Sequence, residues 1–282
     1  MIHVLMATYH ADKAMLNAQT ASILSQRGVR VHLVVREDDC GAGACANFSS
    51  LLDGIVPELR DDDYIAFSDQ DDVWLDDKLA RSMAKMHELE QMWGRDVPLL
   101  VFTDAKVVDE SLHILDDSLF RRSHLNPSRL APHQLILQNV ANGNTMLLNA
   151  ALVRKAVPVP DKAFMHDHWV SLVASVFGHA ACLCEPTLLY RQHASNVLGG
   201  ANVGLRYYMV RLLQGPTRLR TRIYAYMRQA EEFTARYPEA PACFKACVGF
   251  ASRNWLSKRR MLLSQRILKD GFFRNIGLFC VA

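Results

Sequence analysis

The 282-residue chain lacks several features that would place it in well-defined classes of protein. It has no run of about 18 apolar residues, the length that a helix needs to cross a membrane. Only 22% of its residues are charged and 50% are hydrophobic, which excludes a disordered chain and predicts a globular fold. The stretch from Met1 to Thr8 is too short, and lacks the basic start, for a secretory signal. We therefore expect a first strand there and a cytoplasmic location.

The cysteines do not form a pattern that points to disulfides or zinc. Their number, seven, is odd, so reduced thiols are expected in a chain without an export signal. Cys182-x-Cys184 and Cys243-x-x-x-Cys247 lack the partner pairs that zinc sites require.

The small net charge of +3 conceals a strong asymmetry along the chain. Residues 1–200 carry 17 basic and 25 acidic side chains, whereas residues 201–282 carry 15 and 4. This division predicts a catalytic body over 1–200 and a basic helical C-terminal segment over 201–282. Such a segment is expected to face a polyanion or an anionic membrane surface, although an ordinary solvated helical appendage remains an alternative.

The most informative stretch begins with the uncharged, β-forming run Tyr64 to Ser68 and continues into Asp69, Asp71 and Asp72. This pattern predicts a buried strand that delivers carboxylates to the edge of a sheet, where ligands of open α/β folds bind. Three carboxylates so close together repel one another unless a cation neutralises them, and oxygen ligands suit Mg²⁺ or Mn²⁺. For Asp69 and Asp71 to converge on one ion, the chain must turn there. The alternative is a solvated turn followed by a helix cap.

The first forty residues predict a parallel arrangement of strands. Ile2–Ala7 is an apolar strand, a helix follows and stops at Gly28, and Val29–Val35 is a second strand. A strand, helix and strand in this order form a parallel pair. Thr8 to Asp12 contains no glycine, which argues against the phosphate loop expected of a sugar nucleotidyltransferase.

Further polar residues occur where predicted elements begin or end. Asp104 follows the strand Leu99–Phe102, Gly143 lies in an Asn-Gly-Asn turn, and Asp167 stands in a Met-His-Asp-His-Trp run that opens a helix. From the residues alone, Asp104 and Asp167 could each be a cap instead of a functional carboxylate.

The segment Phe67 to Leu79 resembles the metal-binding segment of family 2 glycosyltransferases of the GT-A fold. It is similar to that of the bacterial rhamnosyltransferase-like branch, which builds surface polysaccharides. The resemblance extends from about residue 2 to about residue 200. It implies an α/β fold with a mostly parallel sheet flanked by helices. It also implies inverting transfer from a UDP- or dTDP-sugar to a hydroxyl of a glycan or lipid-linked glycan of the lipopolysaccharide, O-antigen or capsule type, with Mg²⁺ or Mn²⁺.

The resemblance also assigns roles to individual residues. Asp167, in the His-Asp-x-Trp pattern, would be the general base. Asp69 would contact the ribose, Asp71 would bind the metal on the diphosphate, and Arg191 and His193 would assist the phosphates, with His193 also a candidate metal ligand. The nucleobase acid lies in the Glu37-Asp38-Asp39 run, where the register is open and we favour Asp38. The remaining candidates are Thr8 and Tyr9 on the nucleotide, and Asp104, Asn142, His166 and Trp169 on the acceptor side.

No family pattern covers residues 201–282, where arginines alternate with aromatic and aliphatic residues. Basic amphipathic helices suit the surface of an anionic bilayer, which predicts a peripheral position on the inner face of the cytoplasmic membrane. The alternative function is a non-catalytic membrane- or nucleic-acid-binding module on a degenerate version of the fold. We consider nucleic acid the less favoured partner.

Overall fold

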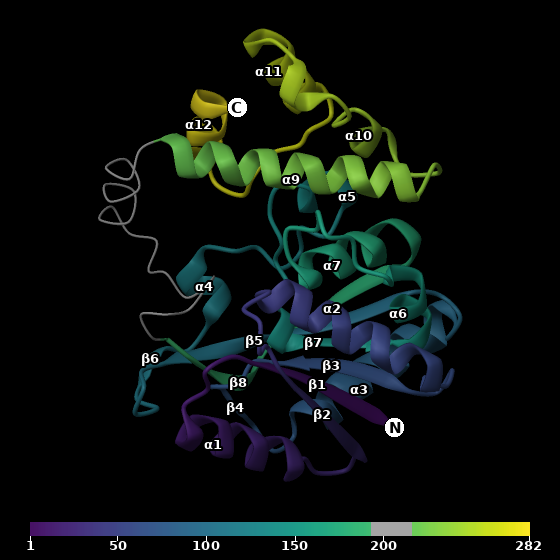
Figure 1. The fold of residues 1–282 in the computed structure, drawn as a ribbon, viewed down its shortest axis with the longest axis vertical. Helices are drawn as coiled ribbons and strands as arrows, with labels where there is room; N and C mark the ends of the chain where they lie inside the picture. The colour runs from purple at the N-terminus through teal and green to yellow at the C-terminus, as the bar shows by residue number, and fades with distance from the viewer. Residues whose placement is uncertain (193–215) are drawn as a thin grey trace.

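The computed structural model describes residues 1–192 and 216–282, which form a mixed β-sheet covered by helices and a further group of helices on one side (Figure 1). The sheet has the strand order β2-β1-β3-β7-β5-β8-β4, and β6 pairs with β5. The strands are β1 (Ile2–Thr8), β2 (Val31–Glu37), β3 (Tyr64–Ser68), β4 (Val73–Trp74), β5 (Leu99–Val108), β6 (Ile114–Asp116), β7 (Met146–Asn149) and β8 (His179–Arg191).

The helices are α1 (Lys13–Leu24), α2 (Ala44–Ile55), α3 (Lys78–Trp93), α4 (Leu119–Ser123), α5 (Pro132–Leu135), α6 (Ala150–Ala156), α7 (His166–Phe177), α9 (Pro216–Arg236), α10 (Ala242–Lys245), α11 (Trp255–Ser264) and α12 (Phe272–Val281). Three short 3₁₀ turns are η1 (Val56–Glu58), η2 (Gly143–Thr145) and η3 (Phe250–Ser252).

The sheet is mixed: its longest pairings are parallel, as expected, and shorter antiparallel pairings join them. β1 runs parallel to β2 and β3, as predicted, and β5 runs parallel to β8. β7 is antiparallel to both of its neighbours, β3 and β5, and β4 is antiparallel to β8. The reason is the route of the chain. Residues 109–145 leave the carboxyl end of β5 and enter β7 from that same end, so β7 must run back.

The sheet curls, because a four-residue link joins β3 to β4 although three strands separate them. In a flat sheet these strands would lie about 19 Å apart. A fully extended link of this length reaches only about 18 Å, and residues 70 and 71 form a bend. The link 69–72, which carries the acidic run, therefore crosses the carboxyl edge of the sheet.

Alternating side chains along the strands separate two apolar cores. Leu5 and Phe67 point to the core that includes α2, α6 and α7, whereas Val4 and Met6 point to the core with α1 and α3. The first core continues into α9, where Phe233 lies fully buried beside Trp169. The basic C-terminal helices thus share a core with the strand-and-helix body.

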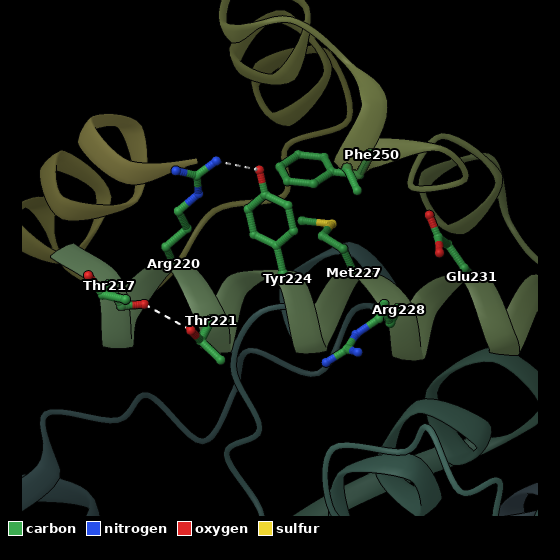
Figure 2. Close-up of a pocket in the computed structure, with 9 residues that line it drawn as sticks. Thr217, Arg220, Thr221, Tyr224, Met227, Arg228, Glu231 and Phe250 are labelled. Carbon is green, nitrogen blue, oxygen red and sulfur yellow. Dashed lines mark hydrogen bonds between the residues drawn. The ribbon is translucent and has the colours of Figure 1, made fainter.

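Helix α9 also borders a groove of about 380 Å³ on the side away from the sheet (Figure 2). Arg220, Tyr224 and Met227 point from α9 toward the segment that carries Phe250. Polar residues of α9, among them Thr217, Arg228 and Glu231, also line this groove.

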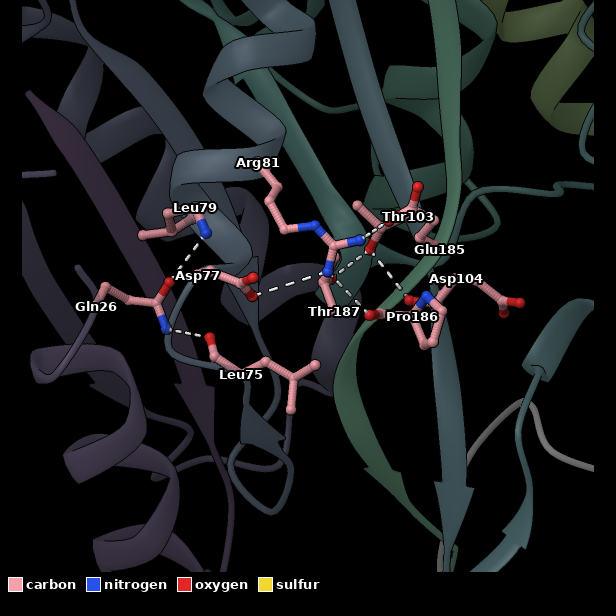
Figure 3. Close-up of polar contacts among 10 residues, drawn as sticks. All are labelled: Gln26, Leu75, Asp77, Leu79, Arg81, Thr103, Asp104, Glu185, Pro186 and Thr187. Carbon is pink, nitrogen blue, oxygen red and sulfur yellow. Dashed lines mark hydrogen bonds and ion pairs between the residues drawn. The ribbon is translucent and has the colours of Figure 1, made fainter. Parts of the chain in front are cut away.

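On the face of the sheet covered by α1 and α3, polar contacts hold the segment that follows Asp72 (Figure 3). The Gln26 amide donates to Leu75 O at 2.6 Å and accepts from Leu79 N at 2.9 Å, which holds the start of α3 against α1. Arg81 of α3 pairs with Glu185 of β8, and the Thr103 and Thr187 hydroxyls lie 2.6 Å apart across β5 and β8. These contacts position the link 69–72 from its C-terminal end.

Candidate active site

The predicted carboxylates gather at the carboxyl edge of the sheet. Asp69 and Asp71 lie on the link after β3 and are half-buried, and Asp167 lies in the first turn of α7 and is also half-buried. The charges of Asp71 and Asp167 both act on Asp69, so acids nearly a hundred residues apart in the chain face one site.

The closeness of these acids raises the pKa of Asp69. Burial, together with the charges of Asp71 and then Asp167, raises the pKa of Asp69 from 3.8 to about 7. A carboxyl with a pKa this high lacks a counter-charge. The arrangement therefore favours a bound cation.

A divalent ion fits the donor set at this edge. Mg²⁺ is commonly held by one or two carboxylates together with phosphate oxygens of a substrate. In residues 1–192 and 216–282 no group of three or more His, Cys, Asp or Glu side chains forms a complete protein cage for a metal. Asp71, with Asp69 beside it, could nevertheless supply the protein share of such a substrate-completed site. His193, the other predicted metal ligand, lies outside the described residues.

Asp72, which we did not assign to the site, holds its framework together. It is fully buried, accepts from Asn144 Nδ2 at 2.5 Å and from Arg191 N at 3.1 Å, and thereby joins the link to η2 and β8. Burial raises its pKa well above the ordinary value, and the charges of Asp69 and Asp71 add to this. Lys78 is also buried, which lowers its pKa to about 7 against the opposing charge of Asp72. Its place in the acidic segment Asp69 to Asp72 was the only sequence signal for this role.

Asp167 has the environment of a poised base. Its Oδ2 accepts from Gly143 N at 3.1 Å and its Oδ1 from His168 N at 2.6 Å. Burial nevertheless raises the pKa of Asp167 from 3.8 to about 6, because desolvation of the carboxylate outweighs these hydrogen bonds. A carboxylate in this range is mostly ionised at neutral pH and still basic enough to take a proton.

Gly143 lets η2 approach the start of α7 closely. A Cβ at this position would lie 3.1 Å from His166 Nε2 and 3.4 Å from Asp167 Cβ. Any larger residue at position 143 would clash with the first turn of α7, which carries His166 and Asp167. The predicted Asn-Gly-Asn turn therefore has a structural reason: it allows the backbone of η2 to hydrogen-bond with Asp167.

Asp38 is the inward-facing member of its acidic run. It is 8% exposed, whereas Glu37 and Asp39 are exposed. Its carboxylate accepts from Ala42 N at 3.0 Å and Gly43 N at 2.8 Å, and the Gly43 bond is the main cause that lowers its pKa. Asp38 is thus the buried member of the run, and part of its hydrogen-bonding capacity shapes the loop before α2.

The end of β1 lies next to the acidic link. Thr8 is buried and its hydroxyl donates to Arg36 O at 3.4 Å, whereas the Tyr9 side chain is 52% exposed. The Gln70 side chain accepts from Tyr9 N at 2.7 Å and donates to Tyr9 O at 3.2 Å. Gln70, which we did not predict, therefore ties the nucleotide-side loop to the link that carries Asp69 and Asp71.

Arg191 does not present its side chain to a ligand, which corrects its predicted role on the diphosphate. It is 5% exposed, its Nε donates to Asp71 O at 2.8 Å, and its Nη1 donates to Glu110 O. The guanidinium thus fixes the backbone of the acidic link. Arg191 positions Asp71.

Trp169 is also misassigned, because its side chain is completely buried. Its Nε1 donates to Ala156 O at 2.8 Å, and its ring packs against Phe233 and Tyr237 of α9. An acceptor cannot reach this ring. Trp169 anchors α7 to the C-terminal helices.

The other residues predicted on the acceptor side have different environments. His166 is 3% exposed, stacks on Phe48, and has no hydrogen-bond partner for either ring nitrogen, so burial lowers its pKa to about 3. Asp104 accepts from the Ser118 hydroxyl and from Phe120 N, so it holds the first turn of α4, whose N-cap residue is Ser118. Asn142 is half-buried and its carbonyl accepts from Thr145, which places it at the start of η2 beside the site.

Comparisons with known proteins support the fold. No family model matches the chain, and no curated protein matches its sequence. Among solved structures, residues 1–349 of S. aureus TarS in complex with UDP match with a TM-score of 0.51 and 11% identity, over 94% of this chain and 88% of that one. This match confirms the predicted α/β fold of glycosyltransferases.

Two further structures are similar at lower scores. The longer TarS structure matches with a TM-score of 0.49 and 12% identity over 94% of this chain, which spans 53% of that one. The mannosyltransferase PcManGT from Pyrobaculum calidifontis, in complex with GDP-Man and Mn²⁺, matches with a TM-score of 0.42 and 12% identity, over 94% of this chain and 86% of that one. At these identities the likeness concerns the fold alone.

Proposed function

We propose that the chain is an inverting, metal-assisted glycosyltransferase that moves a sugar from a nucleotide-diphosphate donor to a hydroxyl of a growing surface glycan. The observation that carries this proposal is the meeting of Asp69, Asp71 and Asp167 at one edge of the sheet. Two of these acids have pKa values raised into the range of 6 to 7, as expected of groups that bind a cation or exchange a proton.

Asp167 acts as the general base. It accepts the proton of the acceptor hydroxyl while that oxygen attacks the anomeric carbon, and the bond from this carbon to the diphosphate oxygen breaks on the opposite face. One displacement inverts the anomeric centre. The hydrogen bonds from Gly143 N and His168 N hold the carboxylate in place during this step.

The donor lies along the ends of β1, β2 and β3. Asp38 accepts a hydrogen bond from the nucleobase, Thr8 and Tyr9 border the nucleotide, and Asp69 contacts the ribose. Asp71 would hold Mg²⁺ or Mn²⁺ at the donor diphosphate, and the bound ion would supply positive charge that stabilises the departing nucleoside diphosphate. Arg191 keeps Asp71 in position through its bond to the Asp71 carbonyl.

A UDP- or dTDP-sugar is the proposed donor, and the structure of TarS with bound UDP on the same fold supports this class. The resemblance of the segment 67–79 to the rhamnosyltransferase-like branch favours a hexosyl or rhamnosyl group. The acceptor is a glycan or a lipid-linked glycan.

The test is a donor panel of dTDP-rhamnose and the common UDP-sugars, read as release of nucleoside diphosphate with and without Mn²⁺. We expect metal-dependent release from one donor, lost in Asp71→Ala and retained in Asp62→Ala, which removes an exposed carboxylate before the same strand. Salt-sensitive binding of an oligonucleotide, without turnover of any donor, would instead favour the non-catalytic module and overturn the proposal.

A further inference from the structure

Exposed apolar side chains concentrate in one short part of the chain. Of the sixteen large apolar side chains that are exposed in the described part of the chain, seven lie between Val248 and Ile276. Phe272 is 75% exposed, Phe273 67%, Leu256 68% and Trp255 64%. An apolar surface of this kind on a folded protein marks a site of interaction.

These side chains form ordered faces on two helices. On α11, Leu256 and Leu263 are exposed at positions i and i+7 with the exposed Arg260 between them, so all three lie on one side. On α12, the exposed Phe272 and Ile276 lie one turn apart, and Phe273 is adjacent. We call this set the docking face; it comprises Trp255, Leu256, Leu263, Phe272, Phe273 and Ile276.

The two helices are fixed to each other and to the body. Arg259 of α11 donates to Ala282 O at 3.1 Å and to Phe279 O, both in or next to α12. Arg274 of α12 donates to Ser123 O and His124 O in the body. Both helices lie on the side of α9 that faces away from the sheet (Figure 1). The docking face is therefore held in a defined orientation.

Cations surround the docking face. Residues 248–276 contain seven Lys or Arg and one Asp. Arg220, which lines the groove beside α9 (Figure 2), contacts the Tyr224 hydroxyl at 3.5 Å. The buried Lys258 contacts the same hydroxyl at 2.6 Å. Within residues 1–192 and 216–282, no carboxylate forms an ion pair with either cation. The surface thus combines apolar area with a net positive charge, to which Glu231 in the groove and Asp270 are the nearby acidic exceptions.

This combination distinguishes among possible partners. A second copy of the chain would bring another seven cations against the first seven, so self-association through this face is opposed by charge repulsion. An anionic bilayer meets both requirements, because acyl chains cover the aromatic side chains and phosphates neutralise the cations. No described helix has the length and apolarity to cross a membrane. Contact would accordingly be interfacial.

We propose that the docking face inserts into the interface of an anionic phospholipid bilayer, with the exposed Arg220 and Arg260 directed to the headgroup phosphates. Sedimentation with vesicles tests this without reference to transferase activity. The lipids are phosphatidylcholine alone and phosphatidylcholine with a third phosphatidylglycerol, each at low and high salt. We expect binding to the anionic vesicles that weakens as salt increases, and little binding to the neutral ones.

Matched variants test whether vesicle binding depends on the docking face or on exposed residues elsewhere on the surface. Phe272→Ser/Phe273→Ser should weaken binding at least tenfold, whereas Leu24→Ser/Met92→Ser, which removes two equally exposed apolar residues on α1 and α3, should not. Arg220→Gln/Arg260→Gln should weaken binding about 25-fold, at about fivefold per cation. Arg30→Gln/Arg60→Gln, which removes two exposed cations before β2 and β3, is the control. Equal binding by all variants, no binding to anionic vesicles, or a wild-type dimer in light scattering that Phe272→Ser/Phe273→Ser abolishes would each overturn the proposal.

Discussion

Replacing the proposed base should make the protein more stable while removing its activity. Asp167 keeps a charged carboxylate in a partly desolvated position, which raises its pKa from 3.8 to about 6. The folded state therefore binds its proton more tightly than the unfolded chain does. The stability from this group is fully present below pH 3.8 and is lost as the pH rises through about 6. Asp167→Asn removes the ionisable carboxyl, so this fall in the free energy of unfolding with increasing pH should disappear.

The expected gain follows from the size of the shift. The rise in the pKa of Asp167 from 3.8 to about 6 corresponds to about 3 kcal/mol in the free energy of unfolding at pH 8. The amide of the substituted side chain has only one oxygen, so one of the two N–H donors, from Gly143 or His168, would face its NH₂ group. Loss of this hydrogen bond costs about 1 to 2 kcal/mol. We expect a net gain of about 1 to 2 kcal/mol at pH 8, and a net loss near pH 4.

Urea unfolding of wild type and Asp167→Asn between pH 4 and pH 8 measures this difference. Asp161→Asn, which alters an exposed carboxylate shortly before α7, serves as the control and should show neither effect. In parallel, donor turnover by the wild type should fall about tenfold per pH unit below pH 6, and Asp167→Asn should lose a factor of about 10² to 10⁴ at pH 7. A variant that is less stable than wild type by the same amount at every pH would refute the reasoning.

Two further substitutions test the parts that hold the site. Gly143→Ala adds a Cβ 3.1 Å from His166 Nε2, so we expect a loss of about 1 to 3 kcal/mol in stability and a drop in kcat with little change in KM, measured by urea unfolding and steady-state kinetics. An unchanged kcat would show that the approach of η2 to α7 is unimportant for the base. Asp72→Ala leaves Asn144 Nδ2 and Arg191 N without acceptors and should cost about 2 to 4 kcal/mol in urea unfolding, whereas Asp72→Asn, which keeps an oxygen, should cost less. Equal losses in the two variants would contradict the hydrogen-bonding role of Asp72.

Local patterns in the sequence predicted the elements that carry the candidate site. The β-forming run before Asp69 is the buried strand β3, and the apolar run Ile2–Ala7 lies within β1. The helix expected after Met165 begins at His166 and carries Asp167 in its first turn. Each of these features depends on neighbours in the sequence, which is why periodicity and composition could find them.

The errors concern side chains whose environment is set by distant parts of the chain. We predicted that Trp169 contacts the acceptor, but α9, which begins more than forty residues later, covers its ring. Arg191 resembled a phosphate ligand, but the carbonyls of Asp71 and Glu110 occupy its guanidinium. The direction of β7 was missed for a similar reason, because it depends on which edge of the sheet the preceding loop reaches. No local pattern records these long-range contacts.

The most direct test of the proposed chemistry is a crystal structure of the chain soaked with the accepted sugar nucleotide and Mn²⁺. We predict an ion bound directly to the Asp71 carboxylate and to diphosphate oxygens, the ribose beside Asp69, and the Asp167 carboxylate facing the anomeric carbon. A soaked crystal in which the ligand binds elsewhere, and Asp69 and Asp71 contact only solvent, would contradict it.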